Sequence, residues 1–125
     1  MKLNLPTINA FLTCQKVQQD VINKNYELLG VFQGFNAPGY PLGVEFVTFC
    51  RLSYDEAAEF QVDISLYDSK GNKISDSSPR KINFGEVACS DLVTAWRVVI
   101  PERGTYVFKI FCNNLNLADF KLYCG

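Results

Sequence analysis

The sequence contains no histidine, and this excludes several kinds of chemistry. Ser-His-Asp catalysis, Cys-His catalysis and every His-containing metal site need that residue. The carboxylates of Asp55, Glu56 and Glu59 gather in one short polar connection. They could serve a hydrolase that uses carboxylates alone, but a solvated acidic loop is the commoner meaning of such a cluster. We therefore predict that the protein is not an enzyme.

The cysteines and acidic residues give no clear metal site. The cysteines are Cys14, Cys50, Cys89, Cys112 and Cys124. Their number is odd and none forms a C-x-x-C pair, which indicates reduced thiols rather than disulfides or zinc ligands. Calcium ligands could come from Asp63, Asp68, Asn72 and Asp76. However, Asp68 and Gly71 suit a hairpin turn, so we expect no metal and no cofactor.

Three tyrosines are the candidate binding residues. Tyr40 lies between Gly39 and Pro41 in the loop 36–43, whose prolines and glycines prevent a regular strand. Its ring could stack on a sugar or anchor a protein partner, or it could fold back over the core. Tyr54 and Tyr67 are the other candidate platforms for a ligand.

Val47 and Phe49 are the candidate interface residues. They give the predicted strand 44–52 a second apolar face, because the alternate positions of that strand are apolar too. Such a face is either a homodimer surface or is covered by an adjacent segment of the same chain. The sequence leaves both alternatives open.

Composition limits the class of protein. The chain has 125 residues, which fits one domain over residues 1–125. Twelve basic and thirteen acidic residues give a net charge of −1 without any block of like charge, so we expect no nucleic-acid partner. No apolar run is long enough to span a membrane. The sequence shows no export signal, which together with the cysteines predicts a cytoplasmic protein.

The elements that must position these residues are strands. Apolar and polar residues alternate with a period of two between turns rich in Gly, Pro and Asn. We expect strands at 3–17, 26–35, 44–52, 60–67, 73–84 and 96–100, followed by a C-terminal pair around a turn at Asn113 and Asn114. Segments 53–59 and 86–92 could each form a helical turn. The pattern predicts an all-β, antiparallel two-sheet β-sandwich of about eight strands.

The order of motifs resembles that of a known family. These motifs are residues 10–14, Tyr-Glu-Leu-Leu-Gly-Val-Phe at 26–32, a Pro-rich loop, Leu-Tyr-Asp at 66–68 and residues 101–108. From about residue 10 to 124 the chain is similar to a family of small uncharacterised bacterial proteins, a domain-of-unknown-function family. The resemblance implies an immunoglobulin-like β-sandwich and carries over no active residues. Many members have Asp where this chain has Gln15.

Two functions remain open. The first is a non-catalytic module that binds a protein partner or forms a homo-oligomer, which the large aromatic content on a small scaffold favours. The alternative is a carbohydrate or small-ligand binding module that uses Tyr40, Tyr54 and Tyr67. A β-sandwich by itself does not decide between them.

Overall fold

The computed structural model describes residues 4–85 and 89–125, and these form an all-β structure. The strands in this part of the chain are β1 (Thr7–Cys14), β2 (Lys16–Gln19), β3 (Tyr26–Leu29), β4 (Gly34–Phe35), β5 (Leu42–Ser53), β6 (Ala58–Tyr67), β7 (Lys73–Asp76), β8 (Arg80–Phe84), β9 (Cys89–Ile100), β10 (Gly104–Cys112) and β11 (Leu115–Cys124).

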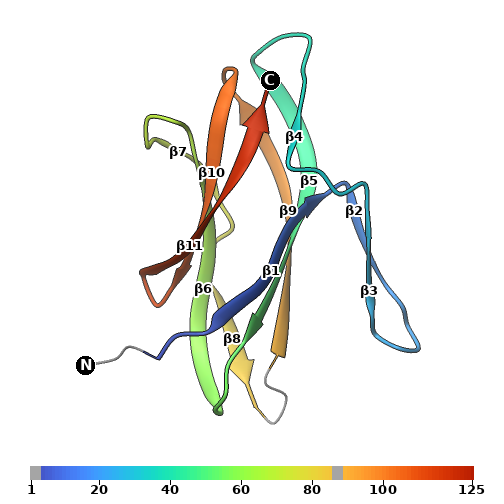
Figure 1. Cartoon of the computed structure of the whole chain (residues 1–125), viewed down its shortest axis with the longest axis vertical. Helices are drawn as coiled ribbons and strands as arrows, with labels where there is room; N and C mark the ends of the chain where they lie inside the picture. The colour runs from blue at the N-terminus through green and yellow to red at the C-terminus, as the bar shows by residue number, and fades with distance from the viewer. Residues whose placement is uncertain (1–3, 86–88) are drawn as a thin grey trace.

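Two sheets face each other, and a hairpin lies beside them (Figure 1). The first sheet has the order β1-β5-β9. The second has the order β4-β11-β10-β6, and β7 and β8 both pair with β6. The hairpin consists of β2 and β3. All pairs are antiparallel except β4 with β11, which is parallel. The prediction of about eight strands is therefore wrong, because the described residues contain eleven. The prediction that all strands are antiparallel is wrong for the pair β4 and β11.

The larger number of strands arises because three predicted strands are interrupted. The expected strand 3–17 ends at Cys14, and β2 begins at Lys16 as part of a different sheet; residues 1–3 lie outside the described residues. The expected strand 26–35 is broken at Gly30, whose φ of 66° no β-strand adopts. The expected strand 73–84 is interrupted before β8, beside Pro79.

The predicted helical turns are not found in the described residues. Residues 55 and 56 form a bend, and β6 begins at Ala58. Of the segment 86–92, residues 86–88 lie outside the described part, and the rest belongs to β9. In the ranges 4–85 and 89–125, no helix is long and apolar enough to cross a membrane.

The core lies between the two facing sheets and has the predicted inward residues. Trp96 is buried against Phe46 and Phe108, and its indole N–H donates to the hydroxyl of Thr48 at 2.8 Å. The predicted alternation of β6 is also confirmed, because Val62, Ile64 and Leu66 and the other inward positions are buried. Period-two alternation found these strands because one face of each meets the opposite sheet.

The predicted hairpin turn after β6 is confirmed. The carboxylate of Asp68 accepts hydrogen bonds from the backbone N–H of Lys70 and of Asn72, at 2.9 and 2.8 Å. Gly71 has the expected positive φ, 85°. These bonds also lower the pKa of Asp68, the bond from Asn72 most strongly. Asp68 therefore serves the turn directly.

Candidate functional site

An apolar groove opens where the edges of the two facing sheets lie side by side, between β1 and β11. We call it the seam groove, and its volume is about 310 Å³. Its lining residues are Phe11, Leu12, Thr13, Val31, Phe32, Gln33, Phe120 and Lys121. In the described residues β1 pairs along its length with β5 alone, and β11 pairs with β10 and only briefly with β4. The groove exists because this side of the two-sheet structure is not closed.

Aromatic rings form the floor of the seam groove. Phe11 of β1 stacks on Phe120 of β11, with ring centroids 4.6 Å apart and planes inclined by 17°. Phe11 also contacts Phe108 in the core, and Phe32 meets Phe46 edge to face at 5.9 Å. Phe11 and Phe120 therefore join the two sheets where no backbone hydrogen bonds do.

Two aliphatic side chains at the rim of the groove are exposed. Leu12 is 39% exposed and Val31 is 54% exposed. Their position is fixed, because the backbone N–H of Phe32 donates to the carbonyl of Thr13 at 2.9 Å and the Thr13 hydroxyl donates to the carbonyl of Phe32. Lys121 is the single charged residue among the lining residues given above. The groove is thus a preformed apolar surface whose lining includes one basic residue.

A second hollow of about 400 Å³ adjoins the seam groove and shares Val31 and Phe32 with it. The additional lining residues are Gln15, Gly30, Gly34, Phe35, Val44, Glu45 and Phe46. Gly30 suits this position by its positive φ, and a Cβ atom there would also displace the exposed Gln15 side chain, whose oxygen would lie 2.7 Å away. Residues 30–32 therefore form a ridge between two hollows.

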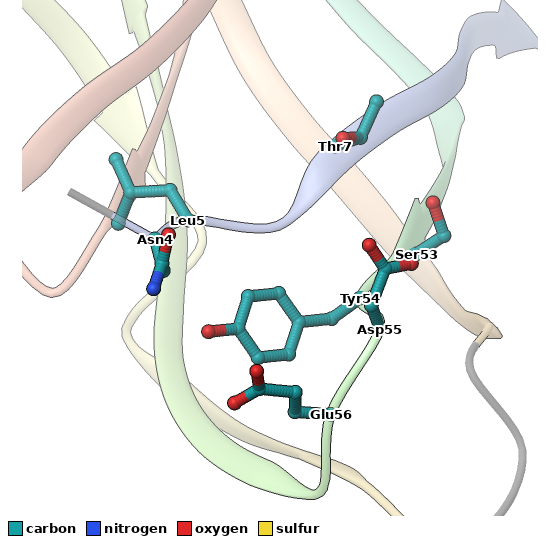
Figure 2. Close-up of a pocket in the computed structure, with 7 residues that line it drawn as sticks. All are labelled: Asn4, Leu5, Thr7, Ser53, Tyr54, Asp55 and Glu56. Atoms are coloured by element: carbon teal, nitrogen blue, oxygen red, sulfur yellow. The ribbon is translucent and has the colours of Figure 1, made fainter. Parts of the chain in front are cut away.

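A separate, polar pocket lies at the end of β5, as Figure 2 shows. We call it the end pocket; its volume is about 220 Å³. Its lining residues are Asn4, Leu5, Thr7, Ser53, Tyr54, Asp55 and Glu56. The Tyr54 ring packs against Phe60 and Phe84, with centroids 4.8 and 5.9 Å away. Its hydroxyl points into the pocket near Glu56 (Figure 2).

The structure does not bring the three predicted tyrosines together. Tyr40 precedes β5 and Tyr54 follows it, so a twelve-residue strand separates them. Tyr40 folds back: its ring packs on the core and its hydroxyl donates to the carbonyl of Gly125 at 2.7 Å. Tyr67 lies under the ammonium group of Lys109, 5.9 Å from the ring centroid. Of the three, Tyr54 alone lines one of the pockets described above.

The apolar outer face of β5 is covered from within the chain at Phe49, which is 5% exposed. The Tyr26 ring of the hairpin lies 5.4 Å from the Phe49 ring, and the guanidinium of Arg51 lies 5.3 Å from it. Of the two alternatives that the sequence left open, cover by an adjacent segment of the same chain is therefore what the structure has at Phe49. Val47 is half-buried.

Sequence reasoning missed the seam groove because of a bulge. Uninterrupted alternation over the expected strand 3–17 puts Ile8, Ala10, Leu12 and Cys14 on one face. The pairing of β1 with β5 shifts between Ile8 and Ala10, so the residues beyond the shift change faces. Phe11 consequently packs against the core while Leu12 points outward. Gly30, inside an otherwise apolar run, was the one local signal for the ridge beside the groove.

The fold and the groove define a small all-β domain of two facing sheets with one open side. The chain belongs to the family of unknown function DUF6941, whose model matches residues 9–124. No curated protein matches the sequence significantly.

Two solved structures share the fold. The alkylpurine DNA glycosylase AlkC of Pseudomonas fluorescens, bound to DNA containing an abasic site analog, is 13% identical with a TM-score of 0.56. The alignment covers 74% of this chain and 27% of the glycosylase chain. A putative β-galactosidase from Bacteroides fragilis is 8% identical with a TM-score of 0.50, over 68% of this chain and 14% of that chain. The chain thus corresponds to about a quarter or less of each, and the likeness concerns the fold alone.

Proposed function

We propose that this protein is a non-catalytic interaction module that binds apolar side chains of a protein partner in the seam groove. The observation that carries this proposal is the pair Leu12 and Val31, exposed above a floor of aromatic rings and held there by hydrogen bonds. Each aliphatic side chain that a partner buries fully on such a surface contributes about 1.5–3 kcal/mol. Lys121 in the lining favours a partner that also carries a carboxylate.

The chemistry of the cysteines supports a non-catalytic function. Burial raises the pKa of Cys50 to about 12 and that of Cys124 to about 11, so neither provides a thiolate near neutral pH. Burial also raises the pKa of Cys14 and of Cys112. All five thiols are free, which supports a reducing compartment, and we propose the cytoplasm.

A peptide-display selection tests this function. Peptides selected on the wild-type protein are measured by calorimetry against Val31→Glu, which places a charge at the groove rim. We expect at least about tenfold weaker binding, because a charge there must be desolvated. Val99→Glu is the matched control, since Val99 is 60% exposed on β9. Peptides that bind both variants as tightly as wild type would remove the seam groove from the function.

A second candidate function, binding of a carbohydrate or small polar ligand, is supported by the end pocket. There an aromatic ring with fixed orientation lies beside two carboxylates, from Asp55 and Glu56, and the hydroxyls of Thr7 and Ser53. An aromatic ring can pack on a sugar face while carboxylates accept hydrogen bonds from its hydroxyl groups.

A glycan array tests the second candidate. Glycans retained by the wild type are measured again with Glu56→Gln, which removes a charged acceptor, and with Tyr54→Phe, which keeps the ring contacts to Phe60 and Phe84. We expect Glu56→Gln to lose retention and Tyr54→Phe, which keeps the ring but removes the hydroxyl in the pocket, to weaken it, whereas Tyr67→Phe retains it. If the wild type retains no glycan, or if both variants bind as it does, the end pocket has no such role.

A further inference from the structure

The tip of the β2–β3 hairpin presents two aliphatic side chains to solvent. Val21 is 90% exposed and Ile22 is 88% exposed, more than any other large apolar residue among those described as exposed. They lie in the turn of residues 20–25 between the two strands, and the hairpin stands beside the facing sheets (Figure 1). We call this turn the hairpin tip.

The conformation of the hairpin tip is held by specific hydrogen bonds. The Asp20 carboxylate accepts from the backbone N–H of Ile22 at 2.8 Å and from that of Asn23 at 3.3 Å. Asp20 N–H donates to the carbonyl of Asn25, and Lys24 N–H donates to the carbonyl of Asp20, both at 2.8 Å. The bonds from Ile22 and Asn23 lower the pKa of Asp20, so this side chain is ionised near neutral pH. Val21 and Ile22 are therefore exposed by a built turn.

The hairpin tip cannot reach the seam groove of its own chain. The base of the hairpin is tied to β1, because Gln15 N–H donates to the carbonyl of Leu29 at 3.0 Å. Tyr26 fixes the hairpin further by packing on Phe49. The four paired positions of the hairpin place its tip roughly 13 Å from that base. Within one chain, therefore, the tip lies apart from the groove and Val21 and Ile22 stay exposed.

We infer that the hairpin tip of one copy inserts Val21 and Ile22 into the seam groove of a second copy of this chain. This inference rests on the proposed function and names the partner. The two aliphatic side chains match the aromatic rings that line the groove, and Asp20 of the tip carries the charge opposite to that of Lys121, the one charged residue in that lining. Because one chain carries both the tip and the groove, two copies can exchange hairpins reciprocally about a two-fold axis.

Sedimentation velocity over about 1 µM to 1 mM tests the contact. We expect the wild type to associate. Ile22→Glu and Val31→Glu should each raise the dissociation constant of the dimer by about 100-fold. Val99→Glu, which changes an exposed valine outside both surfaces, associates like the wild type. Tip and rim variants change exposed side chains, and far-UV circular dichroism checks that they fold.

A mixing experiment distinguishes this contact from other modes of association. Ile22→Glu keeps an intact groove and Val31→Glu keeps an intact tip. Each variant alone associates only about 100-fold more weakly than the wild type, whereas an equimolar mixture forms a tighter one-to-one complex that uses the one remaining tip and groove. Labelling one variant with a fluorophore shows this complex as a faster-sedimenting species.

Three results would overturn the inference: a monomeric wild type at all concentrations, variants that associate like the wild type, or a mixture that stays monomeric. None of them by itself contradicts the proposed function, because the displayed peptides report on the groove independently. If the peptides also bind Val31→Glu as tightly as wild type, the proposed function fails as well.

Discussion

The side chain of Trp96 links the two sheets inside the core. It combines ring contacts to Phe46 and Phe108 with a buried hydrogen bond to Thr48. The aromatic contacts cross from one sheet to the other, whereas the hydrogen bond satisfies two polar groups that water does not reach. Trp96 thus contributes both apolar burial and polar satisfaction.

We expect Trp96→Ala to lower the free energy of unfolding by about 3–5 kcal/mol, because it leaves a cavity between the sheets. Trp96→Phe also leaves the Thr48 hydroxyl without its donor. It keeps part of the ring volume, however, so it should lower the free energy of unfolding by less than Trp96→Ala does. Urea unfolding measures both values. Equal effects of the two variants would show that the hydrogen bond, rather than the volume, dominates at this site.

The cysteines give a second prediction at the residue scale. Cys89 is exposed and the other four thiols are buried, with pKa values raised by burial. At pH 8 a thiol reagent should therefore modify Cys89 quickly and the others only after unfolding. Burial of these protonated thiols also makes the stability depend on pH. Their pKa values in the folded state lie above the value in the unfolded chain. Their contribution to stability is therefore fully present below about pH 8.5 and is lost as the pH rises further. Rapid modification of several thiols in the native protein would contradict the described burial.

At the scale of elements, short segments rather than long strands shape the candidate site. β4 contains two residues, yet its parallel pairing with Tyr123 and Cys124 of β11 anchors residues 30–35 beside the groove. The backbone N–H of Tyr123 donates to the carbonyl of Gln33 at 2.9 Å, and that of Gly125 to the carbonyl of Phe35 at 2.8 Å. The ridge between the two hollows is therefore held at both ends, by β1 and by β11.

Gly34 is the position at which this anchoring can be tested. A Cβ atom there would lie 2.6 Å from the carbonyl oxygen of Tyr123, a backbone atom that the neighbouring strand holds in place. We expect Gly34→Ala to destabilise the protein by about 1–3 kcal/mol and to weaken peptide binding in the seam groove. Gly39→Ala is the matched control, since nothing lies within 4 Å of its added Cβ. Chemical denaturation should show that Gly39→Ala is as stable as the wild type.

At the scale of the whole molecule, the open side and the hairpin are complementary features of one fold. The facing sheets leave the edges of β1 and β11 apart in the described chain, and the hairpin that leaves β1 beside this opening carries its apolar tip away from it. The inferred contact between two copies joins these two exposed apolar surfaces, the tip and the groove.

The inferred self-association predicts that thermal stability depends on protein concentration. Only folded chains can form the dimer, so a higher concentration stabilises the folded state. We therefore expect the melting temperature of the wild type to rise by about 2–4 °C for each tenfold increase in concentration. Ile22→Glu should show a constant melting temperature over the same range. Differential scanning calorimetry measures this, and parallel slopes for the two proteins would contradict the hairpin-to-groove contact.

The sequence alone determined that this is an all-β protein, and it located β5, β6, β10 and the turn at Asp68. Alternation and turn residues act over a few neighbouring positions, so they can be recognised in the chain itself. Only the tertiary structure decided that Phe49 is covered by Tyr26 and that Phe11 meets Phe120. Those contacts depend on one bulge, one left-handed glycine and the packing of distant strands, which local periodicity does not specify.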